Sequence, residues 1–245
     1  MNKTESKIFE KISHRPLVVA SIPDEKKILN MVQKANQTGA DLLELRLDAF
    51  DFKNKEKLFG IAQEIRKKTS LPIIATLRSP KEQGRQVLKS DWNDDERKEI
   101  YEKLLPIVDC IDIELSSNSI NQALIKHAHK LQKKVILSYH DFHSMPQEKE
   151  ILLLVKKFKQ LSGDIFKIAG LANSWEETIR FLYTCSRLNS INRIFIAMGE
   201  IGKFSRIAGF CFGSCLTYGS LSQKTAPGQI PIATLSRQLK MLYSF

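Results

Sequence analysis

Short apolar runs rich in β-branched residues recur along the chain at a regular interval, and segments with helical spacing lie between them. Eight runs can be identified: residues 17–22, 42–47, 73–77, 110–115, 135–139, 165–169, 194–198 and 210–218. Runs that are apolar on both faces are typical of parallel strands in a sheet that helices cover on both sides. Eight strand–helix units in a chain of 245 residues favour a closed (β/α)8 TIM barrel over an open, doubly wound sheet.

The segments between these runs carry the periodicity of helices that cover a sheet. We expect helices over residues 25–35, 55–67, 94–105, 120–131, 148–161, 175–187 and 232–243. Asp24 and Ser174 are predicted N-caps, and Glu177 stands three residues after Ser174, as in a capping box. Between 198 and 210 there is room only for a short helical turn near 205–208. Because no linker or low-complexity tract divides the chain, we expect one domain over 1–245, with residues 1–15 as an N-terminal extension.

Composition and charge narrow the class of protein. Hydrophobic residues make up 42% of the chain and charged residues 27%, which excludes a disordered or collagen-like protein. No run is long enough for a membrane span, and the first residues lack the apolar core of a secretion signal, so we expect a cytoplasmic protein with no membrane partner. The net charge of +11 is compatible with nucleic-acid binding. However, the basic residues are spread in short groups without interleaved aromatics, so we expect no nucleic acid.

The four cysteines are too few for a disulfide scaffold. Cys211 and Cys215 are four residues apart, but no histidine stands near them at metal-ligand spacing. The sequence therefore predicts buried structural thiols and no metal site.

Ionisable residues interrupt the apolar runs near their carboxyl ends, where barrel enzymes carry their chemistry. Glu44 and Arg46 are two residues apart and so point to one face of a strand. The remaining residues of this kind are Arg78, Glu82, Glu114, His140 and Lys167. We interpret this set as the lining of a site at one mouth of the barrel.

Lys167 and His140 are the residues that point most directly to a particular chemistry. A buried ammonium is costly unless it is paired or uncharged, and a neutral amine forms a Schiff base with a carbonyl group. The structural alternative is an ion pair of Lys167 with Glu44 or Glu114. An imidazole at the barrel mouth suits proton transfer, although His140 can equally be a hydrogen-bonded supporting residue.

Two segments near the carboxyl end complete the predicted site. The Pro227-Gly228 pair in the loop that begins at Thr225 favours a lid over the barrel mouth, with Gln229 as a polar contact. Arg206 begins the short turn after the seventh run, where its guanidinium can clamp a carboxylate or cover a helix terminus.

Five segments in one order carry a family resemblance. They are Glu44-Leu45-Arg46-Leu47-Asp48, Arg78-Ser79-Pro80-Lys81-Glu82-Gln83-Gly84, Ser138-Tyr139-His140-Asp141-Phe142-His143, Phe166-Lys167-Ile168-Ala169 and Ala226-Pro227-Gly228-Gln229. With them the chain resembles the type I 3-dehydroquinate dehydratases (3-dehydroquinases), the Schiff-base lyases of the shikimate pathway in aromatic amino acid biosynthesis. The resemblance extends from the first strand to the last helix.

The resemblance implies a role for each matching residue. Lys167 corresponds to the lysine that condenses with the ketone of 3-dehydroquinate, and His140 to the general base and acid. Glu82 corresponds to the carboxylate that orients that histidine. The residues that match the family's substrate-binding positions are Glu44, Arg46, Arg78, Arg206, Thr225 and Gln229. Thr225 is a departure, because the family pattern often has Ser there, but both residues offer a hydroxyl group.

The implied product is 3-dehydroshikimate, and the chemistry needs neither a metal nor an organic cofactor. The resemblance also implies a homodimer. Two other functions remain open on the residues alone. One is another class I Schiff-base aldolase or transaldolase on the same barrel, and the other is an inactive barrel that serves as a basic binding module.

Overall fold

The computed structural model describes residues 15–23, 25–50, 54–82, 92–221 and 224–243. The predicted N-cap Asp24 and almost all of the predicted N-terminal extension lie outside the described residues. The first described residue, Arg15, forms an ion pair with Asp41 at the start of the second strand.

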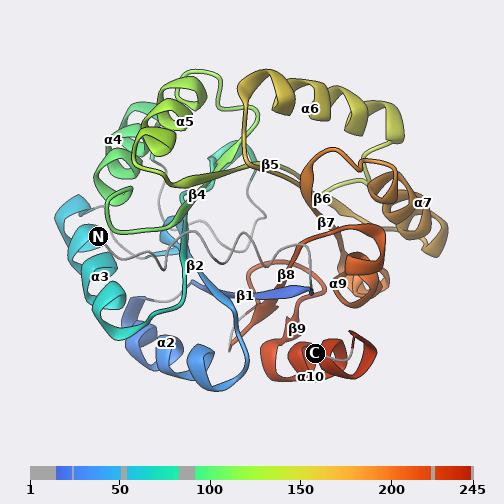
Figure 1. Ribbon diagram of the computed structural model, residues 1–245, viewed down its shortest axis with the longest axis horizontal. Coiled ribbons are helices and arrows are strands. Elements are labelled where there is room, and N and C mark those ends of the chain that lie inside the picture. Colours follow the sequence, from blue (N-terminus) through green and yellow to red (C-terminus); the bar gives the residue numbers. More distant parts are fainter. Residues whose placement is uncertain (1–14, 24, 51–53, 83–91, 222–223, 244–245) are drawn as a thin grey trace.

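Eight parallel strands form the ring at the centre of the molecule (Figure 1). They are β1 (Leu17–Ile22), β2 (Leu42–Arg46), β3 (Ile73–Thr76), β4 (Cys110–Glu114), β5 (Lys134–Asp141), β6 (Ile165–Leu171), β7 (Asn192–Met198) and β8 (Leu216–Ser220). The strand β1 pairs with both β2 and β8, and a short strand β9 (Ile230–Pro231) adds to β8. Between β7 and β8 the ring is closed by a bridge of Arg193 with Ser214. This arrangement confirms the predicted (β/α)8 barrel.

Helices surround the ring. They are α2 (Ile28–Gln37), α3 (Lys55–Lys68), α4 (Asp94–Leu104), α5 (Asn121–Lys130), α6 (Glu148–Leu161), α7 (Trp175–Ser186), α8 (Gly199–Gly202), α9 (Phe204–Ala208) and α10 (Ile232–Tyr243). Ser174 caps α7 as predicted, because its hydroxyl accepts from the backbone N–H of Glu177. The capping box is not complete, however, since the Glu177 carboxylate accepts from the N–H of Asn173 and not of Ser174. Within the described residues, no helix is long and apolar enough to cross a membrane.

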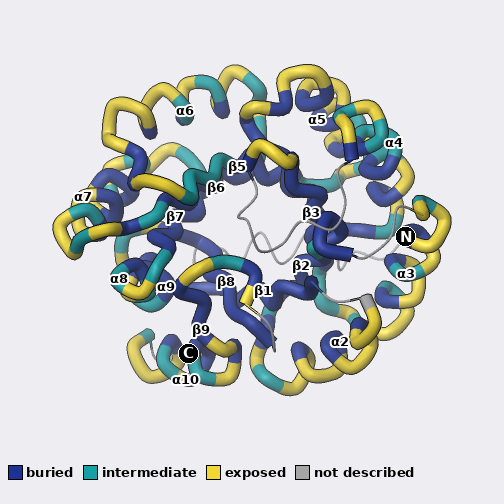
Figure 2. The backbone as a smooth tube through the Cα atoms, turned by 180° about the vertical axis from the view of Figure 1, so that it is seen from behind, coloured by how far each residue is buried: buried dark blue, intermediate teal, exposed yellow. Residues whose placement is uncertain are grey.

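The strands are buried on both faces, and the outward faces of the helices are exposed (Figure 2). One apolar cluster lies between the strands and the helices, and a second fills the inside of the barrel. The inner cluster includes Leu17, Leu42, Cys110, Ile136 and Ile165, which stand at or near the amino ends of their strands. Nearer the carboxyl ends, inward positions carry both apolar residues, such as Ile196 and Met198 of β7, and polar ones, such as Lys167 of β6.

The predicted strand over 210–218 is wrong in its first half. Residues Gly209–Phe212 form a short 3-10 helix, and β8 begins only at Leu216. The chain turns at Gly213, whose φ of +88° is unfavourable for residues with a side chain. Cys211 is the exposed residue of this 3-10 helix, so the prediction of a buried thiol is wrong for Cys211, whereas the other three cysteines are buried.

Candidate active site

A cavity of about 530 Å³, including its open mouth, lies at the carboxyl ends of the strands. Nine of the residues that the sequence singled out for a site line this cavity: Glu44, Arg46, Arg78, Glu82, His140, Lys167, Arg206, Thr225 and Gln229. Glu114, which we also expected in the lining, is buried behind it and does not line the cavity. Strand direction explains this convergence, because the carboxyl ends of all the parallel strands meet at one mouth.

Lys167 lies inside the barrel on β6, with only 4% of its surface exposed. Its ammonium lies 2.8 Å from Asp112 Oδ2 and 3.6 Å from Glu44 Oε1. The aromatic ring of Tyr218 faces the same nitrogen, which is 4.2 Å from the ring centroid. The expected pairing with Glu44 is therefore present at longer range, and the shorter contact is with Asp112.

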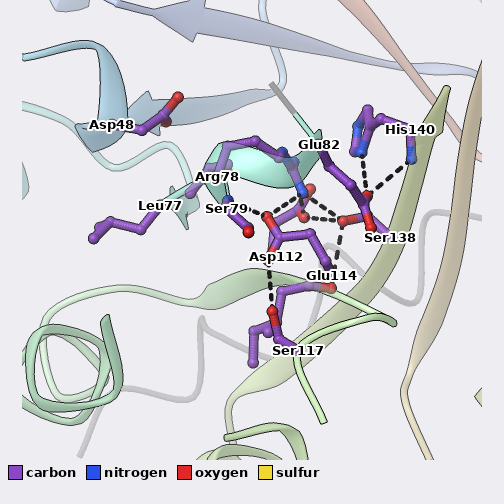
Figure 3. Close-up of polar contacts among 12 residues, drawn as sticks. Asp48, Leu77, Arg78, Ser79, Glu82, Asp112, Glu114, Ser117, Ser138 and His140 are labelled. Atoms are coloured by element: carbon purple, nitrogen blue, oxygen red, sulfur yellow. Dashed lines mark hydrogen bonds and ion pairs between the residues drawn. The ribbon is translucent and has the colours of Figure 1, made fainter. Parts of the chain in front are cut away.

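Glu114, the other predicted partner of Lys167, pairs instead with two arginines. Its carboxylate binds Arg78 at 3.0 Å and also contacts Arg97. Arg78 reaches Asp112 as well, at 3.0 Å, so one guanidinium joins the two acidic side chains of β4 (Figure 3). Burial alone would raise the pKa of Asp112, but the charges of Arg78 and Lys167 outweigh burial and hold this pKa well below its usual range.

His140 and Glu82 approach each other at the mouth. The Glu82 carboxylate accepts a hydrogen bond of 3.0 Å from the backbone N–H of His140 and lies 3.5 Å from the ring nitrogen Nδ1 (Figure 3). The other carboxylate oxygen accepts a bond of 2.6 Å from the Ser116 hydroxyl. Both contacts hold the carboxylate against the imidazole.

The protonation of this pair follows from its surroundings. Burial lowers the pKa of His140 well below its ordinary value, and the nearby charges of Arg78 and Lys167 lower it further. Burial also raises the pKa of Glu82 to about 7, with repulsion from Glu114 acting in the same direction. The imidazole is therefore neutral near pH 7 and can accept a proton.

Arg206 supplies a buried positive charge at the far side of the cavity. Its donors bind the backbone oxygens of Gly228, Pro227 and Tyr218 at 3.0–3.2 Å, and it forms no ion pair with any described residue. Burial lowers its pKa to about 10. A guanidinium held in this way can bind an anionic group of a ligand.

The remaining predicted residues at the cavity are each held by hydrogen bonds to a neighbouring side chain or backbone group. Gln229 and Thr225 form two reciprocal hydrogen bonds, at 2.6 and 2.9 Å, within the loop that covers Arg206. Arg46 binds Asp48 through two nitrogens.

Glu44 is held on β2 by two hydroxyl groups. Its carboxylate accepts from Ser21 at 2.7 Å and from Thr76 at 3.1 Å. Its orientation toward Lys167 is thus fixed by the neighbouring strands β1 and β3.

Sequence reasoning missed Asp112 and Tyr218 as site residues. The signal for Asp112 was its alternation with Glu114 on β4, which places both carboxylates on one face of that strand. Tyr218 looks like an ordinary core aromatic in the sequence, yet its buried hydroxyl has no hydrogen-bond partner among the described residues. Across the described ranges, no group of three or more His, Cys, Asp or Glu side chains is arranged to hold a metal ion.

Comparison with known proteins agrees with the family resemblance. A model of the type I 3-dehydroquinase family matches residues 17–245. The 3-dehydroquinate dehydratase of Aquifex aeolicus is 38% identical over 93% of this chain and 99% of its own length. That of Methanobrevibacter smithii is 36% identical over 89% of this chain and 91% of its own.

Solved structures agree as well. The 3-dehydroquinate dehydratase from Aquifex aeolicus superposes with a TM-score of 0.82 at 35% identity, covering 94% of this chain and 100% of that one. The type I enzyme from Clostridium difficile, solved with covalently modified comenic acid, gives a TM-score of 0.86 at 27% identity, covering 94% and 93% of the two chains. With a family match that spans residues 17–245, the chain belongs to the type I 3-dehydroquinase family.

Proposed function

We propose that this protein is a 3-dehydroquinate dehydratase that converts 3-dehydroquinate to 3-dehydroshikimate, in the shikimate pathway, through an imine at Lys167. The observation that carries the proposal is the composition of one cavity. Three groups face it: a buried amine paired with Asp112, a neutral imidazole at His140, and the guanidinium of Arg206, which forms no ion pair with any described residue.

The proposed reaction begins with the amine. The neutral form of Lys167 attacks the C3 carbonyl carbon, and the carbonyl oxygen leaves as water when the iminium forms. The positive nitrogen makes the neighbouring C2–H bond acidic, and His140 takes that proton. The C1 hydroxyl then leaves as water, with the proton that His140 returns, and a second water hydrolyses the iminium to release the product and the free amine.

In this proposal, Glu82 orients the imidazole ring of His140. Its hydrogen bond from the His140 backbone and its contact with Nδ1 fix the position of the ring. Because burial raises the pKa of Glu82 to about 7, this carboxyl group is only partly ionised near neutral pH.

Arg206 binds the substrate carboxylate in this proposal, and the loop with Thr225 and Gln229 covers that end of the substrate. Bidentate binding of a carboxylate suits a guanidinium whose hydrogen bonds within the described part of the chain go to backbone oxygens. The opposite wall, with Glu44, Arg46 and Arg78, offers donors and acceptors for the ring hydroxyl groups.

The test is a trapping experiment. The protein is incubated with 3-dehydroquinate, reduced with borohydride, and digested for peptide mass spectrometry. We expect a stable adduct on Lys167. An adduct on another lysine would overturn the assignment of the residue, and no adduct on folded protein would overturn the imine mechanism.

Two variants separate the steps. We expect Lys167→Ala to lose both the adduct and turnover. His140→Ala should still form the adduct but should be nearly inactive, because the imine forms before the proton is removed. Turnover by Lys167→Ala would contradict the proposal.

The family membership also leads us to propose a single catalytic domain over the whole chain, a cytoplasmic location and a homodimer. Sedimentation or light scattering of the full chain, whose monomer mass is 28.0 kDa, tests the dimer directly. A monomeric mass at micromolar concentration would contradict it.

A further inference from the structure

A chain of ion pairs leads from the Lys167 amine through the wall of the barrel to an outer helix. Lys167 binds Asp112 at 2.8 Å, and the second oxygen of Asp112 binds Arg78 at 3.0 Å. Arg78 binds Glu114 at 3.0 Å, and the second oxygen of Glu114 contacts Arg97. All of these side chains are at least nine-tenths buried.

Arg97 is the member of this chain farthest from the cavity, which it does not line. It lies on α4, outside the ring of strands, with 1% of its surface exposed. Its Nε donates to the backbone oxygen of Leu77 at 3.0 Å, and Nη1 donates to Ser117 at 3.0 Å and to Asp94 at 2.8 Å. These contacts fix the guanidinium, and through it the Glu114 carboxylate.

Along the contacts that run from Glu44 through Lys167 to Arg97, the charges balance only when Arg97 is counted. Three cations, Lys167, Arg78 and Arg97, face three carboxylates, Asp112, Glu114 and Glu44. Without Arg97 the cluster has an excess negative charge in a region of low dielectric constant, where an unpaired charge is costly. The amine of Lys167 can offset that excess by keeping its proton, but a protonated amine cannot attack a carbonyl group.

We propose that Arg97 is a positioning residue for imine formation, which acts by neutralising Glu114 so that Arg78 and Asp112 hold the Lys167 amine without an excess of negative charge. This inference rests on the proposed function. The titratable and charged groups that face the amine or line its cavity come from several elements: Glu44 and Arg46 of β2, Arg78 and Glu82 after β3, Asp112 of β4, His140 of β5, Arg206 of α9 and Tyr218 of β8. Those that face Arg97 are Asp94, Tyr101 and Glu114.

Two substitutions of Arg97 distinguish the effect of its positive charge from the effect of its forked hydrogen bonds. Arg97→Lys keeps the positive charge but loses the forked contacts, whereas Arg97→Gln loses the charge and keeps a hydrogen-bond donor. We expect both to destabilise the fold. Only Arg97→Gln should move the acid limb of the kcat/KM profile upward, by about one pH unit, and move the pH dependence of borohydride trapping with it. A purely structural role would leave both profiles in place.

In Glu114→Gln the acid limb should move in the opposite direction. This test remains available even if the Arg97→Gln variant does not fold. Removing the carboxylate leaves an excess positive charge, so we expect the acid limb to move to lower pH. The double variant, Arg97→Gln with Glu114→Gln, restores the balance and should return the limb toward its original position. Shifts of Glu114→Gln and Arg97→Gln in the same direction would overturn the inference.

Arg66→Gln is the matched control. Arg66 lies on the neighbouring outer helix α3 and binds Asp109 at 2.9 Å together with the backbone oxygens of Thr69 and Leu71, away from the cavity. We expect a loss of stability without a change in either pH profile. If the unaltered protein yields no adduct on Lys167, the proposed function fails. If the unaltered protein does form this adduct, and the acid limb of the kcat/KM profile stays at the same pH in Arg97→Gln, only the inference about Arg97 is wrong.

Discussion

Glu82 changes its charge near neutral pH. Its pKa in the folded protein is about 7, raised mainly by burial, whereas an exposed glutamate titrates near 4.5. Between these values the folded state holds a proton that the unfolded state has released. The stability that this proton contributes is therefore complete below about pH 4.5 and is lost as pH rises through 7, by up to about 3 kcal/mol.

Glu82→Gln removes this pH dependence. The amide oxygen can still accept from the His140 backbone, and the amide nitrogen can donate to Ser116, so the contacts survive without the charge. We expect the stability of the variant relative to the unaltered protein to increase between pH 5 and pH 8.5, measured by urea unfolding. Glu176→Gln, at an exposed side chain on α7, is the control and should show no such trend. An equal difference at both pH values would contradict the assignment.

The site residues that could be predicted were those whose charge interrupts an apolar strand. Lys167 and His140 stand out in this way, and strand direction brings them to one mouth. Partner choice could not be predicted, because it depends on side-chain reach across the barrel. Lys167 contacts Asp112 at 2.8 Å, and Glu114 turns instead toward Arg97 on an outer helix. No local pattern relates Arg97 to the amine.

The loop before α10 determines where Arg206 points. Gly228 accepts from the Arg206 guanidinium at 3.0 Å and has a φ of +74°. A Cβ at this position would lie 2.2 Å from the backbone oxygen of Gly199, which cannot move as a flexible side chain could. Any residue with a side chain must therefore displace the loop.

We expect Gly228→Ala to lower kcat/KM by about tenfold or more, because small displacements of a binding group are costly in catalysis. Gly60→Ala is the matched control: Gly60 lies on the exposed face of α3, where a Cβ would meet nothing within 4 Å. It should leave kcat/KM unchanged and raise stability by about 0.5–1 kcal/mol. Steady-state kinetics and thermal unfolding of both variants distinguish these effects. Unaltered kinetics for Gly228→Ala would show that the loop does not position Arg206.

The eight strand runs and the long helices followed from periodicity except at residues 210–218, whereas the short elements α8 and β9 were not predicted. An apolar run can belong to a strand or to a helix, and periodicity alone does not separate the two in so short a segment. Tertiary contacts determine the outcome here. The Arg193 guanidinium lies where a side chain at Gly213 would be, and the backbone of Arg193 accepts from Cys215 at 2.8 Å. The strand therefore starts later than its composition suggests.

At the scale of the whole molecule, the two ends of the barrel differ in what their buried arginines contact. Arg193 and Arg206 are both buried, and both donate to backbone oxygens. Arg193 stands at the amino end of β7, beside the bridge that closes the ring, whereas Arg206 faces the cavity at the carboxyl ends. Similar contacts thus hold one arginine at the closure of the ring and the other at the cavity, where we propose that it binds the substrate carboxylate.

This division predicts that Arg193→Met and Arg206→Met differ in kinetics although both lose stability. Each variant loses hydrogen bonds that satisfy buried backbone oxygens, at a cost of about 1–3 kcal/mol. At a temperature where both are folded, we expect Arg193→Met to keep its KM and kcat. Arg206→Met should raise KM more than it lowers kcat, since binding energy shared by substrate and transition state is lost. Because each variant is the control for the other, a raised KM in both would mean that closure of the ring and the shape of the cavity cannot be separated.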